Sequence, residues 1–214
     1  GIFPLTLIPS RLILNEIKEM NIKNLVIDIT ELIEKHHKLY RFPVKAELWE
    51  DIWDQTINGW DSNWNGGSHS SGADVISEDK DEARYQNKGG DVNLNKNSIK
   101  WNGHRTTKHK TIQDKIDFIS QDHYDYYVML GRNKKEWDNG IKRYYLLIFN
   151  SDKIDYTNLD WKETFNKDNE VNGWSGQNSN LSYSAKISKS MSDQLWTESD
   201  IDYLGKLYTI DIGS

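Results

Sequence analysis

Residues 72–76 read Gly-Ala-Asp-Val-Ile, residues 84–88 read Arg-Tyr-Gln-Asn-Lys, and an acidic turn at residues 78–82 separates the two segments. Both segments are predicted to be short strands. Side chains alternate across a strand, so Gln86 and Lys88 point to the same face. Pairing of the two strands can bring Asp74 to that face as well. A carboxylate, an amide oxygen and a lysine would then converge, and such a point can hold a divalent metal and a polarised water beside a phosphate.

Hydrophobic spacing and turn residues predict the other elements around this pair. The predicted helices span residues 10–20, 22–39, 44–57, 111–120 and 192–204. The further predicted strands span residues 94–101, 124–131, 144–150 and 185–191. Gly89-Gly90 suggests a bend or bulge, and residues 151–182 are predicted to form a loop because they contain Asn-Gly and Ser-Gly turn signals.

This order of elements predicts an α/β fold, with a mixed central β-sheet flanked by helices. No internal repeat or linker interrupts the 214 residues, so we expect one domain over residues 1–214. Its parts would be a helical N-terminal part (1–58), a catalytic sheet core (66–150) and a C-terminal recognition and closing part (151–214).

Composition limits the class of protein. The chain contains no cysteine, which excludes disulfides and thiolate metal sites and is compatible with a reducing compartment. No signal peptide is visible and no apolar run approaches the length of a membrane span, so we expect a cytoplasmic protein that does not contact membranes.

The distribution of charge points to a polyanion. The net charge is −6, but residues 84–115 contain eight Lys or Arg against only Asp91 and Asp114. The eight are Arg84, Lys88, Lys96, Lys100, Arg105, Lys108, Lys110 and Lys115. Contacts to nucleic acid depend on local positive charge and not on the total, so this stretch favours DNA binding.

The segment from Asp74 to Lys88 resembles the PD-(D/E)xK signature of nucleases, and specifically type II restriction endonucleases. Asp74 matches the aspartate of the signature and Lys88 its lysine. Gln86 stands where Asp or Glu is usual, and Ala73 stands where Pro is common. The resemblance implies a restriction-endonuclease-like core and Mg²⁺-dependent, sequence-specific cleavage of double-stranded DNA to 5′-phosphate and 3′-hydroxyl ends. It also implies a homodimer and a cognate DNA methyltransferase as genomic neighbour.

The same resemblance suggests roles for individual residues. Asp74 and Gln86 would bind Mg²⁺, and Lys88 would polarise the attacking water or the scissile phosphate. Because Gln86 is neutral, a helix carboxylate is expected to add negative charge. We favour Glu47 over Glu50, because Glu50 adjoins Asp51 in what reads as a solvated acidic pair; a solvated helix face is the alternative for both.

Two polar segments are candidates for DNA contact. The first comprises Ser68, His69, Ser70 and Ser71, and the second comprises His104, Arg105, Thr106, Thr107 and Lys108. The alternatives are a flexible turn for the first and a solvated loop for the second. Two rival functions also remain open: a non-catalytic carbohydrate-binding module, using Trp, Asn and Asp of residues 58–66 and 172–178, and a low-specificity repair or phage nuclease of the same fold.

Overall fold

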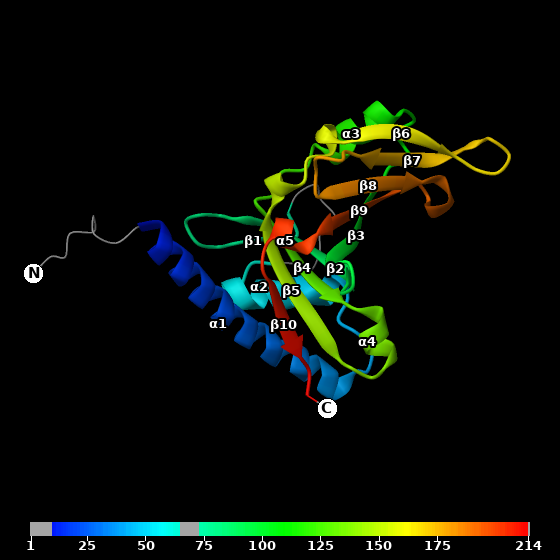
Figure 1. Ribbon diagram of the computed structural model, residues 1–214. Coiled ribbons are helices and arrows are strands. Elements are labelled where there is room, and N and C mark those ends of the chain that lie inside the picture. The colour runs from blue at the N-terminus through cyan, green and yellow to red at the C-terminus, as the bar shows by residue number, and fades with distance from the viewer. Residues whose placement is uncertain (1–9, 65–72, 214) are drawn as a thin grey trace, which may run out of the picture.

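The computed structural model describes residues 10–64 and 73–213, with side chains described from residue 21 onward (Figure 1). The helices in this part of the chain are α1 (Ser10–Leu39), α2 (Ala46–Asn58), α3 (Ile112–Ile119), α4 (Lys134–Asp138) and α5 (Ile201–Leu204). The strands are β1 (Val75–Ile76), β2 (Arg84–Asn93), β3 (Ser98–Arg105), β4 (Tyr126–Arg132), β5 (Arg143–Asn150), β6 (Asp160–Phe165), β7 (Val171–Gln177), β8 (Tyr183–Ser188), β9 (Gln194–Asp200) and β10 (Leu207–Asp211).

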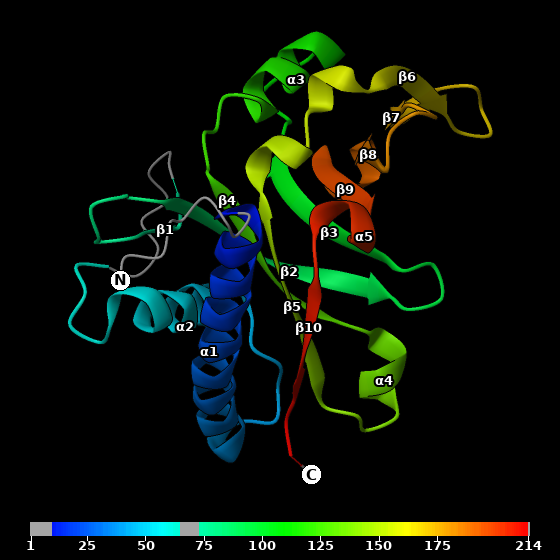
Figure 2. The same cartoon turned by 60° about the vertical axis from the view of Figure 1, so that its left-hand side comes forward.

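All of these strands belong to one mixed, open sheet. Its order is β10-β5-β4-β2-β3-β9-β8-β7-β6, with β1 attached to β2. β2 and β4 are parallel, with Tyr85 opposite Tyr126, and the other neighbouring strands are antiparallel. The predicted α/β class with a mixed central sheet is therefore confirmed. In Figure 2 the half of the sheet that contains β6–β9 turns away from β4, β5 and β10.

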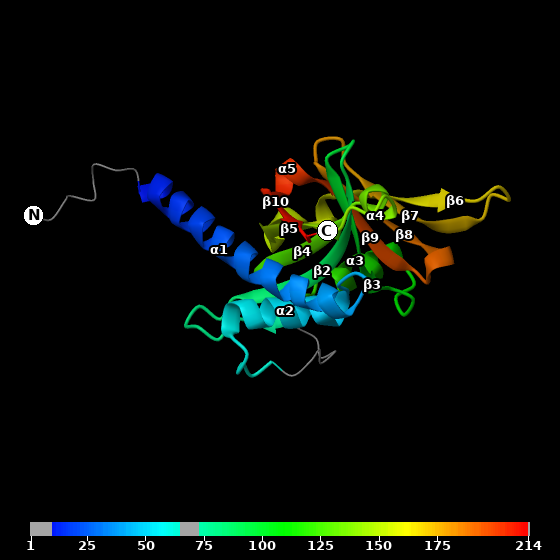
Figure 3. The ribbon, with the colours of Figure 1, turned by 90° about the horizontal axis from the view of Figure 1, so that it is seen from below.

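Both faces of β4 are buried, and the alternation of its side chains separates two cores. Val128 and Leu130 face the core beneath α1 and α2, whereas Met129 faces the core that includes β8 and β9. Figure 3 shows α1 and α2 lying together beside the sheet. The buried centre of the strand is therefore a continuous apolar run, as expected for a strand covered on both sides.

Helix α2 is anchored to the sheet by its tryptophans. Trp49 and Trp53 lie one turn apart, and each is 1% exposed. The indole Nε1 of Trp49 donates a hydrogen bond of 3.0 Å to the carbonyl of Val128. This contact holds α2 against β4, the parallel neighbour of β2, on which Lys88 lies.

Two predictions about where elements are interrupted are wrong, one for a segment without glycine and one for a pair of glycines. Residues 10–39 form one helix and not two, since no Gly or Pro interrupts the segment. Strand β2 runs straight through Gly89 and Gly90, which pair in register with Leu130 and Gly131, so no bulge forms there.

The C-terminal third differs most from expectation. Residues 151–182 are not a loop, because they contain the β6–β7 hairpin. Gly173 and Gly176 lie inside β7, where a Cβ would approach the Ile187 carbonyl oxygen to 2.3 Å and the Trp161 ring to 2.8 Å. These glycines mark close approach and not turns.

The predicted closing helix at residues 192–204 is also wrong, because most of it is β9. Leu195, Thr197 and Ser199 are buried at alternate positions, which is the period of a strand. Only α5 at its end is helical, and the edge strand β10 follows it. None of the helices in the described part of the chain combines the length and apolar character that crossing a bilayer requires.

Candidate functional site

The centre of β2 has an open edge. On that side β1 pairs with Arg84 and Tyr85, and β3 pairs only with residues 91–93. Within the described residues, no strand pairing covers residues 86–90 on this edge, whereas β4 pairs with residues 85–91 on the other edge. The side chains of Gln86 and Lys88 therefore lie where two neighbouring strands diverge.

Asp74 reaches the same opening from β1. Val75 is opposite Tyr85, so the register places Asp74 directly opposite Gln86. The Asn87 backbone N–H donates to Asp74 Oδ2 at 2.9 Å, which fixes the carboxylate beside β2. The structure thus brings Asp74, Gln86 and Lys88 together as the strand alternation predicts.

Lys88 is surrounded by carboxylates. Burial lowers its pKa, while Asp74, Glu50 and Asp122 act in the opposite direction. Burial likewise raises the pKa of Asp74, against the Asn87 hydrogen bond and the positive charge of Lys88. The two groups offset part of each other's desolvation cost, and each is held in its charged form partly by the other.

The helix carboxylate at this site is Glu50, and the preference for Glu47 is not supported by the geometry. Burial raises the pKa of Glu50 to about 7, and the negative charges of Asp74 and Glu47 add to the shift. Glu47 is exposed in the first turn of α2. The expected solvated Glu50–Asp51 pair does not form, because Asp51 accepts a hydrogen bond from Gln55 while Glu50 turns toward Asp74 and Lys88.

Three oxygen-bearing side chains at the opening fit a hard divalent cation. Glu50 Oε2 and Gln86 Oε1 are buried without a hydrogen-bond partner, and the Asp74 carboxylate lies beside them. Oxygen ligands of this kind suit Mg²⁺, which usually keeps several waters and binds through one or two carboxylates together with substrate phosphate. Among the described residues no group of three or more His, Cys, Asp or Glu could hold a metal. With Glu50 and Asp74, the amide oxygen of Gln86 would be the third donor at this opening.

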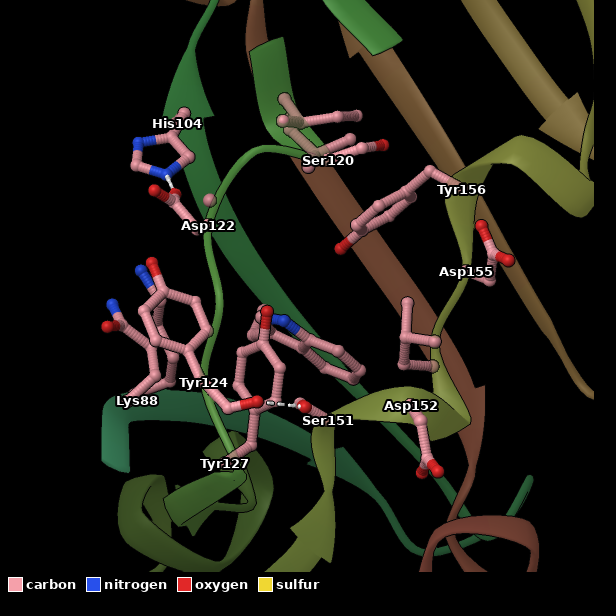
Figure 4. Close-up of a pocket in the computed structure, with 16 residues that line it drawn as sticks. Lys88, His104, Ser120, Asp122, Tyr124, Tyr127, Ser151, Asp152, Asp155 and Tyr156 are labelled. Carbon is pink, nitrogen blue, oxygen red and sulfur yellow. Dashed lines mark hydrogen bonds and ion pairs between the residues drawn. The ribbon is translucent and has the colours of Figure 1, made fainter. Parts of the chain in front are cut away.

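A cavity of about 170 Å³ continues from Gln86 and Lys88 toward β3. Its wall includes His104, Asp122 and Tyr124 (Figure 4). Nε2 of His104 is hydrogen-bonded to Asp122 Oδ2, in a pair that is partly exposed. The sequence prediction did not include Asp122 and Tyr124. The signal for them is their position immediately before β4, the strand that lies parallel to β2.

The end of β3 and the loop that follows it contain the second set of predicted DNA contacts, and these residues divide into two groups. Arg105, Thr107 and Lys108 are exposed. Thr106 is 0% exposed, and its hydroxyl donates to the Asp193 carbonyl at 2.8 Å. The prediction that Thr106 contacts DNA therefore does not fit, because its side chain is committed inside the protein.

Lys115 is also not part of an exposed basic surface, although it belongs to the basic stretch of the sequence. It is 1% exposed, and its ammonium donates to the Thr106 carbonyl at 2.8 Å and to Asp193 Oδ2 at 2.9 Å. Lys115 is itself buried and its charge is neutralised by the part-buried Asp193, so it cannot contribute to phosphate binding. Lys88 likewise belongs to the opening at β2 and not to an exposed basic surface.

The remaining sequence predictions concern two other regions. Ser68, His69, Ser70 and Ser71 lie outside the described residues. Of the tryptophans in the two segments of the carbohydrate-binding alternative, Trp60 is 80% exposed, whereas Trp174 is only 8% exposed and belongs to the core. The acidic turn at residues 78–82 is exposed, as expected for a segment outside the site. Comparison of this chain with protein-family models, with curated proteins and with solved structures finds no match.

Proposed function

We propose that this protein is a Mg²⁺-dependent DNA endonuclease that cleaves double-stranded DNA at specific sites, as type II restriction endonucleases do. The observation that carries the proposal is the position of Lys88 among Glu50 and Asp74 at the open edge of β2. A lysine held partly buried beside two carboxylates and an unsatisfied amide oxygen is costly to fold, and perturbed groups of this kind concentrate at functional sites.

Each residue of the opening has a role in the proposed hydrolysis. Glu50, Asp74 and Gln86 would hold Mg²⁺, which when bound neutralises phosphate charge and lowers the pKa of water. The ammonium of Lys88 would orient the attacking water and stabilise negative charge on the phosphate. The water oxygen forms a bond to phosphorus, the bond from phosphorus to O3′ breaks, and the products carry 5′-phosphate and 3′-hydroxyl ends.

The exposed cations after β3 support DNA as the substrate. Arg105 and Lys108 lie on the segment that continues from His104, at one wall of the cavity. Phosphates of a duplex that enters the opening would reach these cations without a change of fold. A homodimer and a cognate methyltransferase belong to the same proposal, since two-fold DNA sites are matched by two-fold proteins.

Two measurements separate the proposal from its rivals. Discrete fragments from phage DNA indicate a site-specific enzyme, whereas a continuous smear indicates the low-specificity nuclease of the same fold. Retention on polysaccharide without any cleavage of DNA would favour the carbohydrate-binding module, against which the burial of Trp174 already argues.

The direct test is cleavage of plasmid DNA in Mg²⁺ by the wild type and by carboxylate variants. We expect Asp74→Asn and Glu50→Gln each to lower the rate by about a hundredfold or more, the scale of losing one electrostatic catalytic group. Glu47→Gln is the matched control, since it removes the same charge one helical turn away on an exposed position. A wild type without Mg²⁺-dependent cleavage, or a larger loss in Glu47→Gln than in Glu50→Gln, would contradict the proposal.

A further inference from the structure

His104 and Asp122 form a histidine–carboxylate pair beside the proposed catalytic lysine. His104 is near the end of β3, and Asp122 is on the segment between α3 and β4. Nε2 of His104 is bonded to Asp122 Oδ2, and the hydroxyl of Tyr124 also bonds to Asp122. Two partners therefore hold the carboxylate, and the carboxylate in turn holds the imidazole ring.

The pair faces the opening and not only the solvent. His104, Asp122 and Tyr124 line the same cavity as Gln86 and Lys88. In Figure 4, Asp122 lies between His104 at one end of this wall and Lys88 at the other. The electrostatic neighbours agree with this order, because Asp122 acts on Lys88 and His104 acts on Asp74.

One nitrogen of His104 is left for a substrate. Nε2 is used by Asp122, and no described residue forms a hydrogen bond with Nδ1. A carboxylate that binds one imidazole nitrogen fixes the proton there and orients the other nitrogen. His109 provides a contrast in the same region, since it also stacks on Phe118 but has no carboxylate partner and does not line the cavity.

We propose that His104 is the general acid of the reaction and donates its Nδ1 proton to the leaving 3′ oxygen of DNA, with Asp122 as its positioning residue. This inference rests on the proposed function. Attack and departure lie roughly in line through phosphorus. Lys88 on β2 and His104 on β3 lie at the two ends of one wall of the cavity. A phosphate bound against this wall would have its attacking water toward Lys88 and its leaving oxygen toward His104.

The proton balance of the step is complete. The water oxygen binds phosphorus as the bond to O3′ breaks, and the electron pair of that bond goes to O3′. O3′ takes the proton from His104 Nδ1, and the imidazole becomes neutral with its remaining proton on Nε2, still bonded to Asp122. The proton released by the water passes to the surrounding solvent, and His104 regains a proton from solvent before the next turnover.

A substrate with sulfur in place of the bridging 3′ oxygen tests this role directly. A thiolate leaves without protonation because a thiol is a far stronger acid than an alcohol, with a pKa of about 8.5. We expect His104→Asn to lower single-turnover cleavage of the oxygen substrate by about a hundredfold, and that of the sulfur substrate by no more than about threefold. His104→Gln should show the same pattern, and Asp122→Ala a weaker form of it.

His109→Asn is the matched control and should leave the ratio of the two rates unchanged. A second readout needs neither DNA nor metal: ¹⁵N NMR of the free wild type should show the neutral ring of His104 with its proton on Nε2, and Asp122→Ala should redistribute that proton between the nitrogens. Unfolding midpoints close to that of the wild type establish that each variant is folded.

The possible results separate the two proposals. If the wild type cleaves neither substrate, the proposed function is wrong, and the role of His104 falls with it. If the wild type cleaves both and the His104 variants lose equal activity on both, the proposed function stands and the general-acid role is overturned. An unchanged ring tautomer in Asp122→Ala would overturn the positioning role of Asp122.

Discussion

The raised pKa of Glu50 predicts a loss of stability as the pH rises, in the absence of divalent metal. The pKa rises from its ordinary value of 4.5 to about 7, chiefly through burial. The folded state therefore holds this proton more tightly than the unfolded state does. Its contribution to the free energy of unfolding is fully present below about pH 4.5 and is lost as the pH rises through about 7.

The size of this loss of stability follows from the shift in the pKa of Glu50. At about 1.36 kcal/mol for each pKa unit, a rise from 4.5 to about 7 corresponds to about 3.4 kcal/mol. Glu50 is only half-buried, and screening by solvent reduces this figure to about 1–2 kcal/mol. Replacing Glu50 by Gln removes the charge and keeps the shape, so the variant should gain that amount over the wild type between pH 5 and pH 8.

The assay is urea unfolding in EDTA at pH 5 and pH 8 for the wild type, Glu50→Gln and Glu47→Gln. Glu47→Gln is the control because Glu47 is exposed in the same helix and its charge adds less to the Glu50 shift than burial does, so most of the pH dependence of the wild type should remain in this variant. Added Mg²⁺ should stabilise the wild type more at pH 8 than at pH 5. It should also stabilise Glu50→Gln less than it stabilises the wild type. Equal pH dependence in the wild type and Glu50→Gln would refute the burial and charge argument for Glu50.

Other substitutions test the remaining parts of the site. Lys88→Ala should lower cleavage by about a hundredfold while DNA binding in Ca²⁺, measured by gel shift, largely survives. Gln86→Glu should tighten Mg²⁺ binding measured by calorimetry, whereas Gln86→Leu should weaken it together with cleavage. Arg105→Ala and Lys108→Ala should each weaken binding equally on cognate and unrelated DNA and reduce the log–log salt slope by roughly one, and an unchanged slope in both would exclude them as phosphate contacts. Lys115→Met should lower the free energy of unfolding measured in urea by about 1–3 kcal/mol, because the Thr106 carbonyl and the part-buried carboxylate of Asp193 lose their donor.

The part of the site that follows from strand period could be predicted from sequence. Alternation places Gln86 and Lys88 on one face, and the length of the turn at residues 78–82 allows Asp74 to lie opposite Gln86. The choice between Glu47 and Glu50 could not be made in this way. It depends on how far α2 is rotated about its axis, and that rotation is set by Trp49 and Trp53 in the core.

The C-terminal third shows the same limit for the fold. Gly173 and Gly176 carry a turn signal in sequence, but the deciding contacts come from Ile187 and Trp161, which are distant in the chain. Asp122 is likewise found only when α3 and β4 bring it beside His104. Local propensity identifies elements with strong periodicity, whereas residues that act through long-range contacts appear only in the folded chain.

The contacts that join Thr106 and Asp193 can form only late in the synthesis of the chain. The two residues are 87 positions apart, and two hydrogen bonds from Thr106 together with the ion pair of Lys115 join them. A growing chain emerges from the ribosome from its N-terminus, so the contacts that hold the segment beside Arg105 cannot form until residue 193 has been added and β9 can pair with β3. The strands that carry Asp74 and Lys88 are made long before this point. Synthesis therefore completes the basic wall of the opening after its carboxylates and lysine.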